Sequence, residues 1–153
     1  MMILIGKNYL KTAIPLIDNA KTNIDILMYQ WGYYSSPVKC TIQQITLAIK
    51  SAIIRGVTVR ILIHAGSPAD GLRRKNSETM SHLGSWGANV KWYKKSGTMH
   101  SKLLLIDKTL AICGSHNYSK KSMSGNIETS VLVEGSGEIR PFLDYFDILW
   151  GQN

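Results

Sequence analysis

The sequence has little cysteine, few acidic residues and no long apolar run, and each shortage narrows the class of protein. Its two cysteines, Cys40 and Cys113, are too few for a disulfide framework, and neither lies in a CxxC pair or a Cys/His ligand spacing. We therefore expect no metal site and no cofactor. No apolar stretch approaches the roughly 20 residues that cross a bilayer, so a membrane-spanning protein is not expected.

The first residues, Met-Met-Ile-Leu-Ile-Gly-Lys, lack the basic region, the long apolar region and the cleavage site of a secretory leader. We expect them to form the first element of the fold and the protein to be cytoplasmic, although a leader already removed would leave no trace. The composition is 44% hydrophobic and 18% charged, with no low-complexity tract. Residues 1–153 are expected to form a single domain with its own core.

The net charge of +8 is concentrated in one part of the chain. Residues 71–127 hold ten basic residues against two acids, whereas the remainder holds eight of each. A solvated basic face is the ordinary interpretation of such an excess. Binding of an extended polyanion is the alternative interpretation, and the choice between the two depends on the other polar residues of the same segment.

Apolar spacing predicts a layered α/β domain in which a mixed sheet is flanked by helices. Strands are expected over residues 2–5, 23–29, 57–63, 89–93, 110–113 and 129–133, with one more that carries His100 and Lys102 and ends at Asp107. Helices are expected over residues 9–20, with a kink or late start at Pro15, over 41–55, with Thr41 as N-cap and Gly56 as stop, and over 77–86, 118–123 and 139–150. Ser67 and Pro68 have the pattern of an N-cap and a first helical residue, and residues 31–40 of a loop.

Residues 99–117 concentrate the polar chemistry of the chain. His100 and Lys102 are two positions apart, so on a strand both side chains leave the same face. Asp107 ends this apolar run, a second apolar strand follows, and residues 114–117 supply Gly, Ser, His and Asn. A base or nucleophile, a point charge, an amide and a hydroxyl thus converge on something negatively charged. The obvious target is a phosphate.

The pattern HxKxxxxD, followed after six residues by GSxN, resembles the signature of the phospholipase D superfamily. Every defined position is matched, by His100, Lys102, Asp107, Gly114, Ser115 and Asn117. Downstream, Glu128 resembles the acidic residue that this family places behind the histidine. The resemblance covers nearly the whole chain and implies one phospholipase D-like half-unit.

The family chemistry implies a phosphodiester hydrolase without metal or other cofactor, in which one histidine attacks phosphorus and another protonates the leaving group. This chain has one HxK motif, so the resemblance implies a homodimer whose site holds His100 from both copies. His100 would form a phosphohistidine, while Lys102 and Asn117 would hold the non-bridging oxygens. Ser115 and the backbone near Gly114 would assist.

Two acidic residues complete the implied site. Glu128 would accept a hydrogen bond from the far imidazole nitrogen, which fixes the tautomer and stabilises the charged ring. Asp107 would act from a distance, by orienting a loop or the lysine.

The remaining histidines and the aromatic loop have simpler interpretations. His64 and His82 are not part of any such polar motif, so we expect them to be structural. His116 occupies the variable position of GSxN and is expected to be only a neighbour of the site. Trp31 and the two tyrosines after it could be packing residues or could stack on unpaired bases.

The substrate class rests on charge and size. A small chain with localised basic charge and an aromatic loop favours a nuclease acting on DNA or RNA, and no amphipathic segment suggests stable membrane association. The alternatives are a phospholipase D or cardiolipin hydrolase with the same chemistry, and a nucleic-acid-binding module with a disused site. The expected substrate contacts are Gly114, Arg73, Arg74, Lys94, Lys95, Lys120, Lys121 and Trp31.

Overall fold

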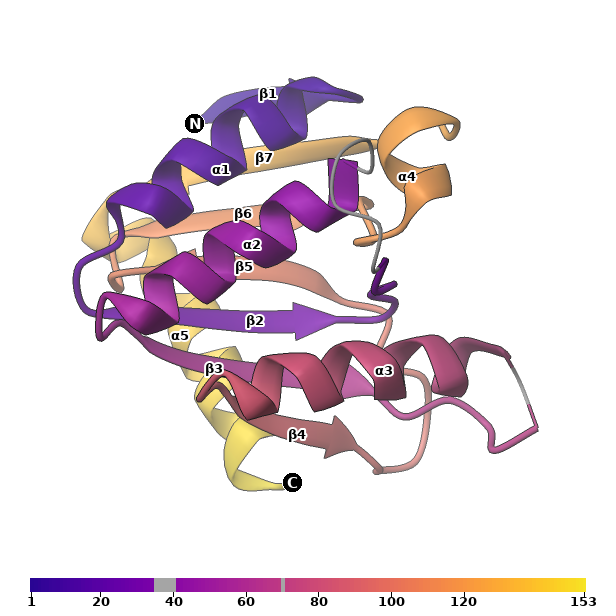
Figure 1. Cartoon of the computed structure of the whole chain (residues 1–153). Coiled ribbons are helices and arrows are strands. Elements are labelled where there is room, and N and C mark those ends of the chain that lie inside the picture. The colour runs from indigo at the N-terminus through magenta and orange to yellow at the C-terminus, as the bar shows by residue number, and fades with distance from the viewer. Residues whose placement is uncertain (35–40, 70) are drawn as a thin grey trace.

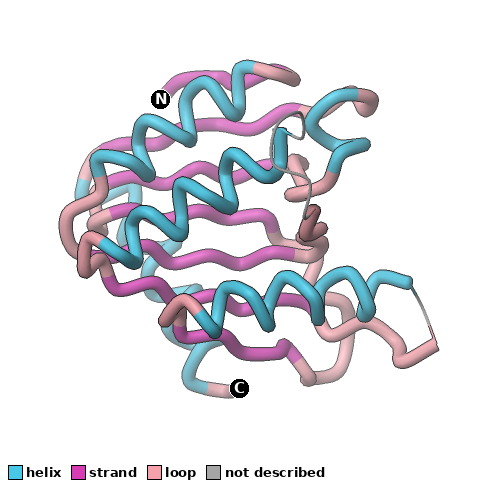
Figure 2. Tube along the Cα trace, in the orientation of Figure 1, coloured by secondary structure: helices cyan, strands magenta, loops and turns pink. Residues whose placement is uncertain are grey.

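The computed structural model describes residues 1–34, 41–69 and 71–153, and in these residues helices cover both faces of a seven-stranded sheet (Figures 1 and 2). The strands are β1 (Met2–Ile5), β2 (Asn23–Met28), β3 (Thr58–His64), β4 (Asn89–Tyr93), β5 (Lys102–Ile106), β6 (Leu110–Gly114) and β7 (Thr129–Glu134). The helices are α1 (Asn8–Asn19), α2 (Thr41–Ile54), α3 (Gly71–Ser85), α4 (Lys120–Ser124) and α5 (Ser136–Gly151). The predicted layered α/β fold is confirmed.

The sheet is mixed, with strand order β1-β7-β6-β5-β2-β3-β4. Strands β2, β3 and β4 are parallel, and every other neighbouring pair is antiparallel. The carboxyl ends of β2, β3, β4 and β6 therefore lie at the same edge of the sheet as the starts of β5 and β7. Figure 1 places this edge on the right, next to α4.

Two apolar clusters separate the sheet from its helices. Helices α1, α2 and α3 lie on one face, where Ile26 of β2 packs with helix residues such as Ile17 and Ile49. Helix α5 lies on the other face, where its Phe146 packs in one cluster with Leu27. Burial of each large aliphatic side chain stabilises the fold by about 1.5–3 kcal/mol. Because β2 is buried on both faces, it is a firm support for the residues that follow its carboxyl end.

The end of α2 matches the sequence prediction. Gly56 adopts φ +90°, its amide donates to the carbonyl of Ile53 (2.9 Å), and the amide of Val57 donates to that of Ala52 (3.0 Å). This pair of bonds is the Schellman arrangement, in which glycine takes the left-handed position. Thr41, predicted as the N-cap, is the first residue of α2, and residues 35–40 of the predicted loop lie outside the described part of the chain.

Two helix starts differ from prediction. Helix α1 begins at Asn8 and runs through Pro15, so the expected late start is wrong. Helix α3 begins at Gly71, so Ser67 and Pro68 belong to the preceding loop, where the Ser67 hydroxyl accepts from the amide of Ala69 (3.3 Å). The first half of α3 was missed because polar side chains occupy its buried positions and hide the apolar period.

Candidate active site

The site residues expected from the sequence come mainly from segments that meet at one edge of the sheet. Lys102 opens β5 and pairs with Met28, the last residue of β2. Gly114 closes β6 and pairs with Ser130 near the start of β7. Because β5 and β6 run in opposite directions, the start of one lies beside the end of the other. The side chains that flank these strand ends therefore share the edge beside α4 (Figure 1); they are His100, Ser115, Asn117 and Glu128.

A tyrosine that the sequence pattern did not single out contacts the side chains of both His100 and Lys102. Tyr29, the residue after β2, has its ring centroid 4.5 Å from that of the His100 imidazole. The ammonium nitrogen of Lys102 lies 4.9 Å from the Tyr29 ring centroid and donates a 2.6 Å hydrogen bond to the His100 carbonyl. His100 itself precedes β5, which begins two residues later than expected. Tyr29 and this hydrogen bond fix His100 and Lys102 relative to one another.

The electrostatics of the pair favour a neutral imidazole beside a cation. Burial and the charge of Lys102 lower the pKa of His100 from its usual 6.5, so the ring is neutral at pH 7. Burial lowers the pKa of Lys102 to about 8, against the opposing effect of the Glu128 carboxylate. Lys102 is 7% exposed and still carries its proton at pH 7. The edge therefore offers a nucleophile and a positive charge at once.

The turn after β6 is fastened to the start of β7. A Cβ on Gly114 would collide with the Ser130 hydroxyl and the Thr129 carbonyl, so only glycine allows this close approach. The Ser115 amide donates to the Thr129 carbonyl (3.0 Å), and the Ser115 hydroxyl accepts from the Thr129 amide (3.0 Å). Gly114 and Ser115 thereby hold the residues that follow them in place.

Asn117 and His116 both lie near the site but differ in their hydrogen bonding. The Asn117 Oδ1 atom is buried and finds no hydrogen-bond partner among the described residues, which marks it as an amide with unused capacity at the site edge. His116 is fully buried, with Nδ1 2.8 Å from the Ser130 hydroxyl and Nε2 3.2 Å from the Gly6 carbonyl. Its position is structural, beside the site.

Glu128 lies in the site but does not make the expected bond. Its Oε1 accepts hydrogen bonds from the hydroxyl of Ser122 (2.8 Å) and the amide of Asn126 (3.0 Å), and no bond joins it to His100 within the described chain. Burial alone would raise the pKa of Glu128, but hydrogen bonds from Ser115, Asn126 and Ser122 outweigh it and lower the pKa. The expectation of a direct bond to His100 is wrong for the single chain. Glu128 acts as a fixed negative charge near Lys102.

Asp107 is far from the other site residues, so its place among the catalytic residues is a mistaken expectation. It follows the last residue of β5, whereas Lys102 is the first, and five strand residues span about 16 Å. Its carboxylate accepts from the amides of Lys21 (2.9 Å), Thr22 (2.7 Å) and Asn23 (3.1 Å). The residue does orient a loop, as expected, but that loop joins α1 to β2 at the opposite edge of the sheet.

Trp31 is a core residue and cannot stack on a base. It is fully buried, its indole nitrogen donates to the Thr46 hydroxyl (3.0 Å), and its ring packs edge-on against Tyr118 with centroids 4.7 Å apart. The expected substrate contact at Trp31 is therefore wrong. The packing interpretation of this aromatic residue is correct.

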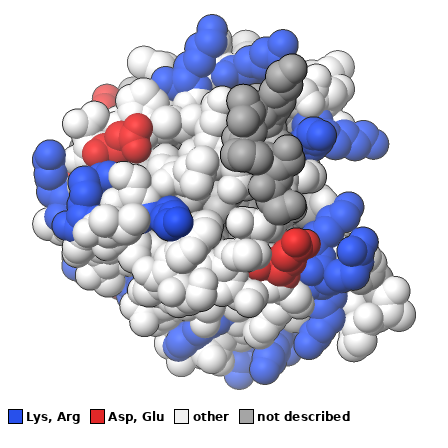
Figure 3. Space-filling view, in the orientation of Figure 1, with Lys and Arg blue, Asp and Glu red and all other residues white. Residues whose placement is uncertain are grey.

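The expected basic contacts flank the site from two directions. Arg73 and Arg74 lie in the first turns of α3, and Arg73 sits 5.4 Å from the Trp92 ring centroid. Lys94 and Lys95 follow β4 and are exposed, and Lys120 and Lys121 lie exposed on α4. Figure 3 shows Lys and Arg side chains gathered along this edge of the molecule, with others elsewhere on the same face.

Asn76 of α3 is a positioning residue that the sequence did not reveal. It is fully buried, and its amide nitrogen donates to the carbonyls of Tyr29 and His64, both at 2.9 Å. Its oxygen accepts from the amide of Trp31 (2.9 Å). One side chain thus ties the ends of β2 and β3 together beneath the site. A buried polar side chain whose donors and acceptor are all hydrogen-bonded indicates such a role, and it can be recognised only in the folded structure.

The described residues contain no group of three or more His, Cys, Asp or Glu side chains placed to hold a metal ion. In the same part of the chain, no helix has the length and apolarity needed to cross a membrane.

Comparisons with known structures agree with this architecture. The Nuc protein of Salmonella typhimurium, a phospholipase D family member, superposes with a TM-score of 0.82 at 22% identity, over 99% of this chain and 95% of that one. NucT of Helicobacter pylori superposes with a TM-score of 0.76 at 20% identity, over 98% and 94% of the two chains. At these identities the likeness is one of fold.

Comparisons of sequence give the family. The human mitochondrial cardiolipin hydrolase is 26% identical over 147 residues, which cover 96% of this chain and 53% of the relative. Cardiolipin synthase A of Pseudomonas aeruginosa is 30% identical over 116 residues, 73% of this chain and 23% of the relative. The chain thus spans about half the length of the first and less of the second. The family described as "Cardiolipin synthase, PLD-like domain" matches residues 13–150, and the chain belongs to this phospholipase D-like family.

Proposed function

We propose that the protein is a phosphodiesterase that cleaves nucleic acid, with His100 as the nucleophile. The observation that carries this proposal is the cluster of His100, Lys102 and Tyr29, in which a neutral imidazole lies beside a cation at an open edge of the sheet. The side-chain amide of Asn117 lies at the same edge, where its nitrogen can donate to a phosphate oxygen, whereas its buried oxygen can only accept a hydrogen bond. A nucleophile, a cation and an amide donor are what a phosphodiester requires.

In the proposed reaction, an imidazole nitrogen of His100 forms a bond to phosphorus as the bond from phosphorus to the leaving oxygen breaks. A second imidazole gives its proton to that oxygen. The same imidazole then takes a proton from water, whose oxygen attacks phosphorus and breaks the N–P bond, so both rings return to their starting states. Lys102 and Asn117 hold the non-bridging oxygens, and Lys102 supplies the positive charge that a metal ion supplies in other phosphodiesterases.

The second imidazole is proposed to be His100 of a second copy of the chain. The other histidines are poorly placed to give a proton to the leaving oxygen. His116 is buried and hydrogen-bonded, and His82 stacks on Tyr33 with centroids 3.7 Å apart. His64 stacks on Tyr29 (5.3 Å), and His100 contacts the same tyrosine. A two-fold dimer would bring two equal sites together and give each ring one of the two roles. The negative charge of the bound phosphate would raise the pKa of the ring that must be protonated.

Nucleic acid is favoured as substrate because exposed basic residues flank the site on both sides, on α4 and after β4. An extended polyanion makes use of both groups, whereas one lipid headgroup occupies only the centre. Hydrolysis of cardiolipin is the second candidate, and the observation in its favour is the likeness to mitochondrial cardiolipin hydrolase. A disused binding module would not need a neutral histidine and a lysine held in ring contact.

The test is a substrate panel. Purified protein is incubated in EDTA with labelled single-stranded DNA, double-stranded DNA, RNA and cardiolipin vesicles, beside the His100→Ala variant and the matched surface variant Lys21→Gln. We expect cleavage of at least one nucleic acid by the wild type and by Lys21→Gln, and none by His100→Ala. Cleavage of cardiolipin alone would replace the proposal with the second candidate, and a His100→Ala variant that remains active would remove the proposed nucleophile.

A further inference from the structure

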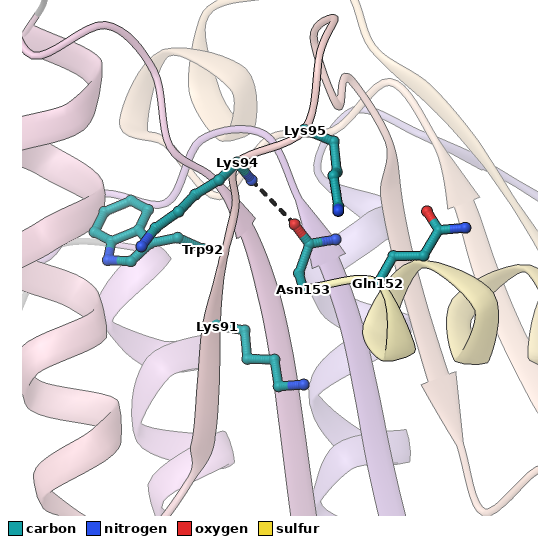
Figure 4. A pocket seen from close by; sticks show the side chains of 6 residues that line it. All are labelled: Lys91, Trp92, Lys94, Lys95, Gln152 and Asn153. Atoms are coloured by element: carbon teal, nitrogen blue, oxygen red, sulfur yellow. Dashed lines mark hydrogen bonds between the residues drawn. The ribbon is translucent and has the colours of Figure 1, made fainter.

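A second basic site lies at the carboxyl end of β4, on the same edge of the sheet as the candidate active site. It is an open pocket of about 420 Å³ lined by Lys91, Trp92, Lys94, Lys95, Gln152 and Asn153 (Figure 4). Three of these side chains are lysines and none is acidic. The pocket therefore has the electrostatic character of an anion site.

The walls of the pocket are fixed by contacts between β4 and the end of α5. The Lys91 ammonium donates to the Trp150 carbonyl (3.0 Å) and lies 4.5 Å from a Trp150 ring centroid. The Lys94 amide donates to Asn153 Oδ1 (3.1 Å), drawn as a dashed line in Figure 4, and Asn153 Nδ2 donates to the Leu149 carbonyl (2.8 Å). These contacts of Lys91 and Asn153 hold β4 and the end of α5 together and form a rigid frame around the pocket.

Two lysines keep their charges free for a ligand. Lys94 and Lys95 are exposed, and neither ammonium has a hydrogen bond or an ion pair with another described residue. In Figure 4 the Lys95 side chain extends toward the side of the pocket formed by Gln152 and Asn153. The Lys94 side chain extends the other way in the same figure, alongside Trp92, so the two unpaired ammonium groups supply positive charge on both sides of β4. Such a surface suits an anionic ligand better than a neutral one.

A row of rings connects this pocket with His100. Tyr93, the last residue of β4, lies 6.5 Å from His64, which lies 5.3 Å from Tyr29, which lies 4.5 Å from His100, all between ring centroids. Tyr29, His64 and Tyr93 are each partly exposed. The row follows the carboxyl ends of three adjacent parallel strands, β4, β3 and β2.

The pocket is too far from His100 to share its phosphate. Strand β4 is three places from β5 in the sheet, a separation of about 14 Å at ordinary strand spacing. A ligand that reaches both sites must therefore carry several phosphates along its length, with flat groups between them. A single-stranded nucleic acid has this form, because unpaired bases stack on aromatic rings while the backbone follows positive charge.

We propose that the pocket binds a backbone phosphate of the same nucleic acid strand whose phosphodiester lies at His100, and that bases between the two sites lie along the rings of Tyr29, His64 and Tyr93. This inference rests on the proposed function for its substrate class. It adds a second phosphate site and a path for the strand, across the ends of β2, β3 and β4.

The test compares Lys94→Gln/Lys95→Gln with Lys11→Gln/Lys21→Gln, a pair that removes the same charge from exposed positions away from the pocket. Both pairs are made in the His100→Ala chain, so that labelled single-stranded DNA stays intact while its Kd is measured by fluorescence anisotropy. We expect Lys94→Gln/Lys95→Gln to weaken binding of a long oligonucleotide by about tenfold and to flatten the slope of log K against log salt by roughly 0.7, the contribution of one phosphate contact to a single strand. The control pair and a dinucleotide ligand should show no such change.

Equal affinities and slopes for the two pairs would overturn the second phosphate site, and so would an equal loss on the dinucleotide, which cannot reach the pocket. Binding of the same two pairs to cardiolipin vesicles is measured by co-sedimentation, and a loss seen only there would assign the pocket to lipid and also overturn the proposal. Because binding is measured in an inactive chain, it judges the pocket separately from catalysis. Absence of nuclease activity in the wild type would count against the proposed function alone.

Discussion

Tyr29 and His100 are in direct ring contact, with centroids 4.5 Å apart and planes tilted by 59°. The same tyrosine ring lies under the Lys102 ammonium. Tyr29 therefore supports the proposed nucleophile and the proposed phosphate-binding cation at once, and it does so from the end of β2, a strand buried on both faces.

Replacement of Tyr29 tests this support. Tyr29→Phe keeps the ring and should retain kcat, whereas Tyr29→Leu should lower kcat roughly 3- to 30-fold, because a cation–π contact is worth about 0.5–2 kcal/mol. The Tyr145→Leu variant, at an exposed position of α5, is the matched control. Steady-state kinetics on a small phosphodiester separate kcat from KM, and a Leu variant that changes only KM would contradict a positioning role.

The pH dependence of kcat/KM should be bell-shaped. Activity is lost on the acid side as pH falls through the lowered pKa of His100 and the neutral nucleophile disappears. It is lost on the alkaline side as the second imidazole loses the proton that it must donate, and further as pH rises through about 8 and Lys102 loses its charge. Glu128→Gln removes the carboxylate that raises the pKa of Lys102, so the alkaline limb should move to lower pH. An alkaline limb that stays in place, or moves up, would contradict this electrostatic role.

Asp107 should matter for stability and not for chemistry. Asp107→Asn retains a residue that tolerates the positive φ of 51° but weakens the hydrogen bonds to the α1–β2 loop, at a cost of about 2 kcal/mol. Those bonds lower the pKa of Asp107 although burial alone would raise it, so the wild-type advantage is full above pH ~4 and disappears as pH falls through the folded-state pKa. Urea unfolding at several pH values measures this difference in the free energy of unfolding between the wild type and the variant. A large loss of kcat at unchanged stability would show that Asp107 takes part in catalysis and would contradict this prediction.

A shared site predicts a particular response to mixing. Wild type allowed to exchange subunits with excess His100→Ala should lose activity per wild-type subunit in proportion to the wild-type fraction, because each mixed dimer has one reactive histidine. The control is the same mixture assayed before exchange. Constant activity per wild-type subunit after exchange would show that one His100 is enough.

The sequence predicted those parts of the site that are local in the chain. His100, Lys102 and residues 114–117 lie within or directly beside strands with clear apolar patterns, and the sequence motif that they form identified them as one group. Trp31 and Asp107 were misplaced because burial and the far end of a strand are properties of the assembled sheet. Tyr29 and Asn76 were missed because their importance lies in contacts across 71 and 47 positions of sequence. No local pattern encodes such contacts.

The most direct test of the central claim is the detection of a covalent phosphoryl group on His100. Wild-type protein is mixed with a single-stranded oligonucleotide in EDTA, quenched in alkali to protect the N–P bond, and digested for mass spectrometry, with His100→Ala carried in parallel. We expect a phosphoramidate on the peptide that contains His100 and none in the variant. Nucleic acid cleavage that depends strictly on Mg²⁺, persists in His100→Ala and leaves no adduct on His100 would contradict the account.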